Sequence, residues 1–370
     1  MKTRACVMMK TGAPVEVREV ELAEPKANEV LVKILATAVC HSDLNTLEDP
    51  TTPVPQVLGH EGAGEVISCG PNVKTCKPGD KVVLSWVPYC GVCPYCRAGK
   101  PHLCESAFGP MFDGTLMDGT TRMTLDGETC YHSSLLSTFS EYTVVPEMSC
   151  VKVPDNMPMA QACMIGCGVA TGYGAAVRAA KVTPGSSVAI FGVGGVGANA
   201  IQGARIAGAT KIIACDIKDD NLEQSLKFGA THTLNTGKAE DVPAAIKEMT
   251  DGIGAEFCID CTGNTKVGSM AWQSGCKGST TVVIGAYPAS GQLILPSGGF
   301  HRIGKVLRGS FYGDVNPFND FPRICDLYLA GKYNLDDLII EKITLEDVNR
   351  VFDIFRDPNG KNMGRYVIEF

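Results

Sequence analysis

The sequence lacks several features that define particular classes of protein. Basic residues are not in excess: the net charge is −7, whereas a nucleic-acid surface needs a basic patch. No basic segment followed by an apolar one opens the sequence, so we expect no secretory signal. The most apolar long stretch, residues 188–209, is rich in glycine and interrupted by Asn199, Gln202 and Arg205. We therefore expect no membrane span.

What is present fits an ordinary globular protein. The chain has 370 residues, of which 45% are hydrophobic and 20% charged, and this length allows two domains with sizeable cores. No internal repeats or low-complexity segments occur. Composition and length are therefore those of a folded protein that is long enough for two domains.

Cysteine is abundant, with 17 residues. In a long chain without a signal peptide, metal ligands and buried thiols are expected rather than disulfides. Six cysteines occupy ligand-like positions, and we interpret the remainder as core or surface thiols: Cys6, Cys69, Cys76, Cys130, Cys150, Cys163, Cys215, Cys258, Cys261, Cys276 and Cys325. A reducing cytoplasm is the compartment that this usage predicts.

The N-terminal part of the chain has the alternation of antiparallel strands. Strands are predicted at residues 5–9, 15–20, 30–34, 64–70, 81–84 and 138–145. Residues 105–140 contain several Asp-Gly and Gly-Pro turn pairs and are predicted to be irregular. A helix is predicted at residues 159–164, ending at Gly166-Cys167-Gly168, where we place a domain crossing.

Four cysteines lie close together on one loop: Cys90, Cys93, Cys96 and Cys104. Four thiolates on a loop with Gly and Pro can close tetrahedrally on one zinc ion, as in structural sites. Four free thiols is one alternative. An iron–sulfur cluster is another, although its usual C-x3-C-P step is missing. A closed zinc site is favoured.

A second candidate metal site centres on Gly59-His60-Glu61-Gly62-Ala63-Gly64. Neutral imidazole is the commonest zinc ligand, and Glu61 is able to reach the same ion. Alone, His60 and Glu61 are also consistent with an ordinary hydrogen-bonded pair. With Cys40 and Cys167 the set offers two thiolates and one imidazole. Three protein ligands with an open fourth position indicate a catalytic zinc rather than a structural one.

The pattern changes to alternating strands and helices after residue 187. A buried strand at 188–191 leads into the turn Gly192-Val193-Gly194-Gly195-Val196-Gly197, then a helix at 198–207 and a strand at 211–215 that ends in Asp216. This order is typical of a dinucleotide site, with the pyrophosphate at the helix N-terminus. Asp216 would accept hydrogen bonds from the ribose and repel a 2′-phosphate, so NAD is favoured over NADP.

The alternation continues to about residue 310. Helices are predicted at 221–228 and 239–249, and parallel strands at 256–260 and 281–285. Two amphipathic helices, 321–329 and 345–356, and a last strand, 365–370, follow. We expect this tail to rejoin the first domain, which gives an α/β protein with a β-rich domain at 1–168 and 312–370 and an inserted doubly wound domain at 169–311.

Together these motifs resemble the zinc-dependent medium-chain alcohol dehydrogenases, near the class III and aryl or allyl alcohol branches. The resemblance covers essentially the whole chain, and Gly59-His60-Glu61, Gly64, Gly70 and Val73 fit the zinc signature of the family. It implies a GroES-like catalytic domain with an inserted Rossmann domain, a catalytic and a structural zinc per chain, and a homodimer or homotetramer.

The resemblance also assigns roles to residues. Cys40, His60 and Cys167 would hold the catalytic zinc, Asp43 would orient His60, and Glu61 would be an alternate ligand. Ser42 would pass the substrate proton. The cofactor-binding residues would be those of the glycine turn and Asp216, joined by His41, Thr171, Val196, Ile284 and Arg365. The implied reaction is reversible hydride transfer between the alkoxide of an alcohol and NAD, with zinc as the Lewis acid.

Two substitutions and one short segment depart from the resemblance. Asn45 occupies the position of a proton-accepting histidine, and Phe108 that of a class III arginine which binds glutathione carboxylate. The segment 49–55 is shorter than in class III enzymes. Glutathione adducts are therefore not expected substrates. Trp86, Phe108, Ser133 and Ser134 are predicted to line the pocket, which favours benzylic, allylic or other primary alcohols, although Trp86 is also consistent with a core position.

Two alternatives to this function stay open. One is a formaldehyde dehydrogenase that uses a thiol other than glutathione. The other is a non-catalytic zinc and NAD sensor, which would have no need of the proton relay at Ser42. Neither a nucleic acid nor a membrane is an expected partner.

Overall fold

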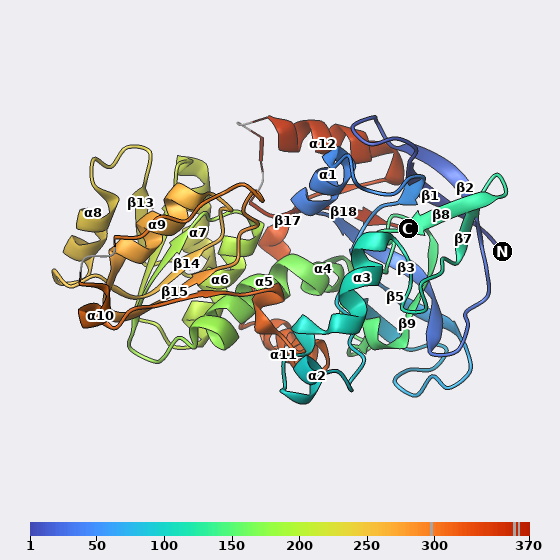
Figure 1. The fold of residues 1–370 in the computed structure, drawn as a ribbon, viewed down its shortest axis with the longest axis horizontal. Coiled ribbons are helices and arrows are strands. Elements are labelled where there is room, and N and C mark those ends of the chain that lie inside the picture. The colour runs from blue at the N-terminus through green and yellow to red at the C-terminus, as the bar shows by residue number, and fades with distance from the viewer. Residues whose placement is uncertain (297–298, 358–359, 362) are drawn as a thin grey trace. The chain divides into compact units, whose positions relative to one another are not determined.

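The computed structural model describes residues 1–296, 299–357, 360–361 and 363–370 (Figure 1). The chain forms two compact units, Met1–Cys167 with Asn316–Phe370, and Gly168–Val315. The sequence predicted that the first domain ends at residue 168 and resumes at residue 312. These boundaries lie one residue later and four residues earlier than those of the structure. A β-rich unit with an inserted unit of alternating strands and helices confirms the predicted fold class.

Strands of the first unit form a small barrel and a larger sheet. The closed barrel has the order β1 (Lys2–Met8), β2 (Glu16–Leu22), β7 (Met123–Leu125), β8 (Glu128–His132) and β4 (Gln56–Val57). The seven-stranded sheet runs β10 (Cys150–Lys152), β6 (Lys81–Leu84), β5 (Glu61–Cys69), β3 (Glu29–Val39), β18 (Arg365–Glu369) and β17 (Ile339–Ile343), with β9 (Tyr142–Pro146) also on β3. Because β18 pairs with β3, the tail rejoins the first domain as predicted.

The expectation of an irregular segment at residues 105–140 was wrong in part. It contains β7, β8 and the helix α3 (Glu105–Asp113). Gly109 and Pro110 argue against a helix locally, but Ala107 and Met111, one turn apart, are buried by it. Burial of this face outweighs the local preference. The unit's other helices are α1 (His41–Glu48), α2 (Pro94–Arg97), α4 (Met159–Met164), α11 (Pro317–Leu329) and α12 (Val348–Arg356).

The prediction that a helix ends at Gly166-Cys167-Gly168 was also wrong. The helical run continues from Met159 to Ala180, with π-helical segments at Ile165–Val169 and Ala175–Ala180. By length and composition alone this run would pass as a membrane span, but 83% of its apolar window is buried within the fold. Burial of this run within the protein core therefore explains its apolar composition.

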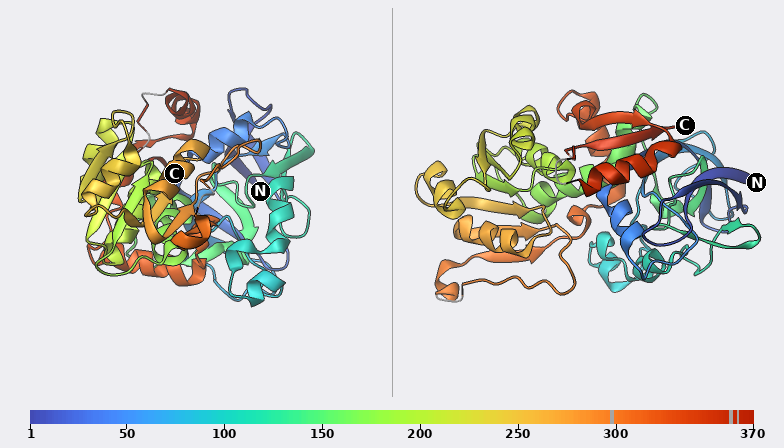
Figure 2. Two further views of the ribbon diagram at one scale, coloured as in Figure 1. Left: turned by 60° about the vertical axis from the view of Figure 1, so that its left-hand side comes forward. Right: turned by 90° about the horizontal axis from the view of Figure 1, so that it is seen from above.

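The second unit is a six-stranded parallel sheet with helices (Figure 2). Its order is β13 (His232–Asn235), β12 (Lys211–Asp216), β11 (Ser187–Phe191), β14 (Ala255–Asp260), β15 (Gly275–Val283) and β16 (Val306–Gly309). The helices are α5 (Ala170–Gly174), α6 (Gly195–Ile206), α7 (Asp219–Phe228), α8 (Val242–Met249), α9 (Thr265–Ser274) and α10 (Phe300–Ile303). The chain builds outward from β11 to β13 and then restarts at β14, so a topological switch point lies between β11 and β14.

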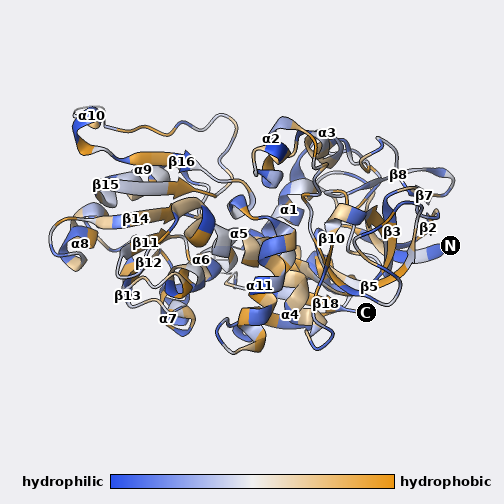
Figure 3. Ribbon diagram, turned by 90° about the horizontal axis from the view of Figure 1, so that it is seen from below, coloured by the Kyte–Doolittle hydropathy of each residue, from blue (hydrophilic) through white to orange (hydrophobic). Residues whose placement is uncertain are grey.

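Hydrophobic residues gather on the central strands of this sheet (Figure 3). All five residues of β11 are buried. Phe191 on β11, Ile213 on β12 and Cys258 on β14 belong to one core cluster. Strands buried on both faces read as continuous apolar runs, which is why the sequence identified them readily.

A buried histidine in the first unit is expected to make the free energy of unfolding depend on pH. His132 is fully buried, and its Nε2 accepts a hydrogen bond of 3.2 Å from the backbone N–H of Arg122. Burial, with the charge of Arg122, lowers the pKa of His132 to about 3, against about 6.5 in an unfolded chain. As the pH falls below about 6.5, only the unfolded chain takes up this proton, so stability is lost progressively toward pH 3.

We expect His132→Asn to remove this loss. Between pH 6.5 and 5 the wild type should lose about 2 kcal/mol of unfolding free energy through His132. Urea unfolding of the zinc-loaded proteins at the two pH values measures the difference. A variant that loses as much stability as the wild type over this range would show that His132 does not contribute.

Candidate metal centre and dinucleotide turn

The structure brings together the predicted open ligand set. The donor atoms of Cys40, His60, Glu61 and Cys167 lie within 4.8 Å of one another, and all four residues are buried. Cys40 follows β3 and caps α1, His60 directly precedes β5, Glu61 begins that strand, and Cys167 belongs to the π-helical segment. Two thiols, one imidazole and one carboxylate are a donor set that suits zinc.

Asp43 orients two of these ligands from the first turn of α1. Its Oδ1 lies 2.8 Å from Nδ1 of His60, and its Oδ2 accepts a hydrogen bond of 2.9 Å from the backbone N–H of Cys40. A proton on Nδ1 leaves the lone pair of Nε2 for a metal ion. The short segment 40–43 therefore fixes both the position of one ligand and the tautomer of another.

Arg365 is the buried cation of the site. Its Nε and Nη2 donate to the carboxylate of Glu61 at 2.9–3.1 Å, and Nη2 lies 3.5 Å from Sγ of Cys40. Hydrogen bonding from Cys167 and the charge of Arg365 hold the pKa of Cys40 well below its usual range. Burial raises the pKa of Glu61, and Arg365 opposes this rise. The pyrophosphate contact expected of Arg365 stays a prediction.

A tight segment after β8 supports the ligand loop. Gly59 has a φ of +95°, and a Cβ there would lie 2.5 Å from Phe139. The carbonyl of Gly59 accepts a hydrogen bond of 2.9 Å from the N–H of Thr138. Ser134, Leu135 and Ser137 have positive φ, a strained conformation that persists only where surrounding contacts impose it. Sequence reasoning missed this support, because no motif marks it.

The proposed proton-relay and pocket residues have the following positions. Oγ of Ser42 lies 3.7 Å from Sγ of Cys40, and Asn45 is exposed on the same helix. The ring of Trp86 meets that of His60 edge-on, with centroids 6.3 Å apart. Phe108 on α3 is 39% exposed and lies 5.8 Å from the ring of Phe112.

Ser133 and Ser134 belong to the turn that follows β8. Ser133 is buried, and its backbone N–H bonds to the carbonyl of Val57 and to Oγ of Ser137. Ser134 is half-buried. Their contribution to a substrate pocket stays a prediction.

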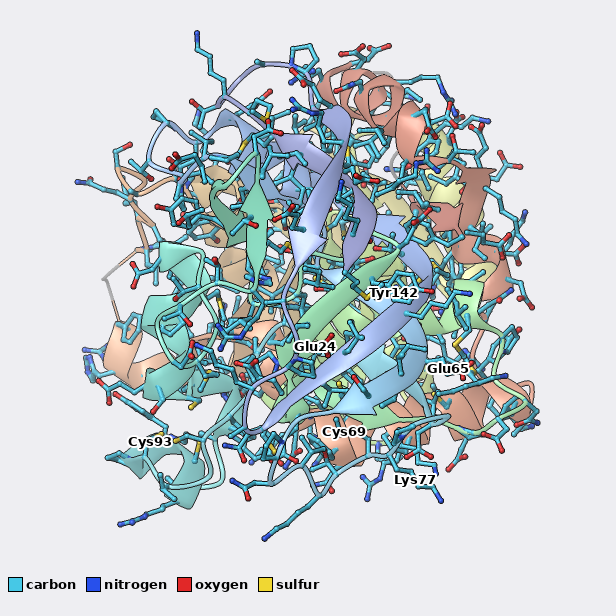
Figure 4. The ribbon with its side chains drawn as sticks, turned by 90° about the vertical axis from the view of Figure 1, so that its right-hand side faces the viewer. Glu24, Glu65, Cys69, Lys77, Cys93 and Tyr142 are labelled. Carbon is cyan, nitrogen blue, oxygen red and sulfur yellow. The ribbon has the colours of Figure 1, made fainter. Side chains whose placement is uncertain are left out.

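The closed ligand set is also assembled. The donor atoms of Cys90, Cys93, Cys96 and Cys104 lie within 4.8 Å of one another, on a loop that reaches the edge of the first unit at Cys93 (Figure 4). The N–H of Cys93 donates to Sγ of Cys90 at 3.3 Å, and a hydrogen bond with Ser106 lowers the pKa of Cys90 to about 6. Four converging sulfurs fit a structural zinc.

The glycine-rich turn joins β11 to α6 in the second unit. Gly192 has a φ of +80°, and a Cβ on Gly197 would lie 2.0 Å from the carbonyl oxygen of Gly192. The first turn of α6 therefore packs directly on the glycine turn, and the binding of a pyrophosphate at this helix N-terminus stays a prediction. Gly194 caps α6, and Gly195 and Val196 begin it.

Asp216 stands at the end of β12, beside the turn. Its Oδ2 accepts a hydrogen bond of 2.8 Å from the N–H of Val193, and its Oδ1 one of 2.9 Å from that of Lys218. In the same unit, Thr171 lies on α5 and Ile284 follows β15. His41 belongs to the first unit, where its ring lies 5.5 Å from that of Phe355. Their cofactor contacts stay predictions.

The donor chemistry and the turn define the class of protein. Three features of the chain are those of a zinc-dependent dehydrogenase: the ligand set that includes Cys40, His60 and Cys167, the loop with four thiols, and the glycine-rich turn at the switch point of a parallel sheet. Residues 26–155 match the alcohol dehydrogenase GroES-like domain, and residues 195–330 match the zinc-binding dehydrogenase domain. The chain belongs to the zinc-dependent alcohol dehydrogenase family.

Individual relatives agree with this assignment. The chain is 41% identical over 96% of each chain to S-(hydroxymethyl)glutathione dehydrogenase of Paracoccus denitrificans, and 42% identical over 96% to an alcohol dehydrogenase class-3 of Cereibacter sphaeroides. Among solved structures it resembles benzyl alcohol dehydrogenase of Acinetobacter calcoaceticus, with 32% identity, 100% and 99% coverage and a TM-score of 0.93. The chain is thus an oxidoreductase with zinc and a nicotinamide dinucleotide as cofactors.

Proposed function

We propose that this protein is an NAD-dependent dehydrogenase of primary alcohols whose carbon next to the hydroxyl bears a flat or unsaturated group. The observation that carries the proposal is the indole ring of Trp86, 6.3 Å from the ring of His60, which offers an aromatic wall next to the ligand set. The structural relative that acts on benzyl alcohol supports the same substrate class. Asp216 supports NAD over NADP, because a carboxylate would repel a 2′-phosphate.

Cys40, His60 and Cys167 would hold the catalytic zinc, and Cys90, Cys93, Cys96 and Cys104 the structural one. A zinc ion in the first site would supply a Lewis acid that favours loss of the alcohol proton. Asp43 holds His60 in the ligating tautomer through its 2.8 Å contact. Arg365 balances the charge of Glu61 and of the Cys40 thiolate, so the site tolerates several anionic groups in a buried place.

The hydroxyl of Ser42 would accept the substrate proton; this role is supported by its 3.7 Å distance from Sγ of Cys40 and by the exposure of the residue. Asn45 cannot serve as a base, so the proton passes from Ser42 to water. The chain would thus orient the ligands, hold the charge and carry the proton outward, and a bound dinucleotide would supply the hydride acceptor.

The two curated relatives described above suggest a second candidate function. They are named for S-(hydroxymethyl)glutathione and class-3 activity. Phe108 argues against glutathione here, because a half-exposed phenyl ring cannot pair with a carboxylate. A formaldehyde dehydrogenase using a smaller or less acidic thiol is the form of this alternative that Phe108 permits.

Substrate profiling separates the two. NADH formation by the zinc-loaded protein is measured with benzyl, allyl and straight-chain alcohols, and with formaldehyde plus glutathione or a small neutral thiol. We expect kcat/KM for benzyl alcohol to exceed that for ethanol at least about tenfold, and Trp86→Leu to reduce this preference about tenfold. Activity on the thiol adducts alone would overturn the proposal.

We also propose a reducing compartment such as the cytoplasm and a homo-oligomeric assembly. The first is supported by the state of the 17 cysteines, all of which lie in the described part of the chain and are free thiols. The second is supported by the resemblance to the family alone.

A further inference from the structure

One buried carboxylate of the second unit lies outside both ligand sets. Asp260 is the last residue of β14 and is fully buried. In the sheet it pairs with Phe191, which ends β11, and with Val283, which ends β15 (Figure 1). Ligands of open parallel sheets bind outside the carboxyl ends of the strands, at the switch point. Asp260 therefore lies at the edge of the sheet where the dinucleotide is expected.

The carboxylate of Asp260 joins two segments that leave this edge. Its Oδ1 accepts hydrogen bonds from the backbone N–H and from the hydroxyl of Thr262, at 2.9 and 2.6 Å. Its Oδ2 accepts one of 2.6 Å from Oη of Tyr287. Thr262 follows β14, whereas Tyr287 lies beyond the end of β15. Because each oxygen has a donor, the buried carboxylate is satisfied, and both segments are tied to it.

The Thr262 side of this network touches the glycine-rich turn. A Cβ on Gly192, the first glycine of the turn, would lie 2.6 Å from Cγ2 of Thr262. The methyl group of Thr262 thus packs on the turn itself, while its hydroxyl bonds to Asp260. The carboxylate is therefore separated from the turn by a single side chain.

The Tyr287 side holds the loop that follows β15, residues 284–287. The backbone N–H groups of Ile284 and Gly285 donate to the carbonyl oxygen of Asp260 at 3.0 and 3.2 Å. These bonds fix the start of the loop, and the side chain of Tyr287 fixes its end through the carboxylate. Main chain and side chain of one residue thus determine where this loop lies.

Helix α9 makes room for the Tyr287 hydroxyl with a glycine. A Cβ on Gly268 would lie 1.9 Å from Oη of Tyr287. Alanine is preferred over glycine inside a helix by about 1 kcal/mol, so the space that the hydroxyl occupies explains the glycine. Burial and the bond to Asp260 raise the pKa of Tyr287, which keeps its phenol protonated as a donor. Residues 288–292, which follow, are exposed.

We propose, on the basis of the cofactor site proposed above, that the hydrogen bond from Tyr287 to Asp260 positions the loop 284–287 for the dinucleotide. A loop that is already ordered forms its wall of the site without a further loss of conformational entropy when the cofactor binds. Tyr287 and Asp260 act through the loop and not on the reacting atoms. Their bond should therefore affect cofactor affinity and not the chemical step.

The test compares the zinc-loaded wild type with Tyr287→Phe, which removes the hydroxyl and keeps the ring. We expect the Kd for NADH, from fluorescence titration, and the KM for NAD to rise about tenfold, with kcat at saturating NAD within about threefold of the wild type. Hydrogen–deuterium exchange of the amides in residues 284–287 should be faster in the variant, because the end of the loop is released.

Tyr328→Phe is the matched control. Oη of Tyr328 donates to Oδ1 of Asp336 at 2.9 Å in the first unit, and loss of this bond should change neither the Kd nor the exchange of the loop. Gly268→Ala displaces the Tyr287 hydroxyl from the helix side and should also raise the Kd, although alanine favours the helix. The test therefore stands even if Tyr287→Phe fails to fold.

Three results would overturn the proposal: an unchanged Kd in Tyr287→Phe, a fall in kcat without a change in KM, or an equal rise of the Kd in Tyr328→Phe. The wild type is titrated first. If it did not bind NADH at all, the cofactor site itself would be refuted, and the positioning role with it. A wild type that binds NADH and a Tyr287→Phe variant that binds it equally well would refute the positioning role alone.

Discussion

Cys167→Ser is expected to lower kcat/KM for alcohol oxidation by about a thousandfold or more, with NAD binding retained. Serine keeps the shape but replaces a thiolate ligand, and a site that polarises the substrate through zinc contributes several kcal/mol to the rate. Cys167 is buried among Cys40, His60 and Glu61, so no exposed group replaces it. Steady-state kinetics and zinc content per chain measure the first effect, and titration of NAD by fluorescence measures the second.

Cys163 provides the matched control for this variant. It is a buried cysteine one turn earlier on the same helical run, and its thiol donates to the carbonyl of Ala160 at 3.2 Å. Cys163→Ser should keep its zinc and its turnover within about twofold of the wild type. Full activity in Cys167→Ser would sink the assignment of the catalytic zinc site.

Asp216→Asn is expected to raise the ratio of kcat/KM with NADP to that with NAD about a hundredfold. The substitution removes the negative charge that would face a 2′-phosphate, and like-charge contacts cost several kcal/mol. It also removes one acceptor for the ribose hydroxyls. Because Oδ2 of Asp216 accepts the N–H of Val193 at 2.8 Å, some loss of affinity for both cofactors should accompany the shift.

Asp219→Asn tests whether the effect depends on position rather than on net charge. Asp219 is exposed three residues further on, in the first turn of α7, where it bonds to Asn235 and Lys238. The cofactor ratio should not change in this variant. An unchanged ratio in Asp216→Asn as well would show that Asp216 does not read the ribose.

Local sequence was sufficient to predict those parts of the site whose residues lie close together in the chain. The Cys90–Cys104 loop, the 192–197 turn and the His60-Glu61 pair each lie within a few residues, so the chain itself holds their donors near one another. The buried strands β11 and β12 were equally accessible, because continuous burial leaves a continuous apolar run in the sequence.

The helices around these motifs were harder to predict. Gly109 and Pro110 signalled a break within α3, and Gly166 and Gly168 signalled a helix end, yet both segments are helical. In each case burial of neighbouring residues outweighs a local preference of about 1–3 kcal/mol. The π-helical turn at Cys167 has no sequence signature of its own, although such turns are frequent at functional sites.

By itself, then, the sequence determined the α/β class, both ligand sets and the dinucleotide turn, since these follow from residue type and spacing. Only the tertiary structure decided that Arg365, from the last strand, neutralises Glu61 beside Cys40. Glu61 and Arg365 are 304 positions apart, and strand pairing brings them together because β5 and β18 both pair with β3. The register of distant strands is fixed by the packing of the whole core, which no local pattern of residues records.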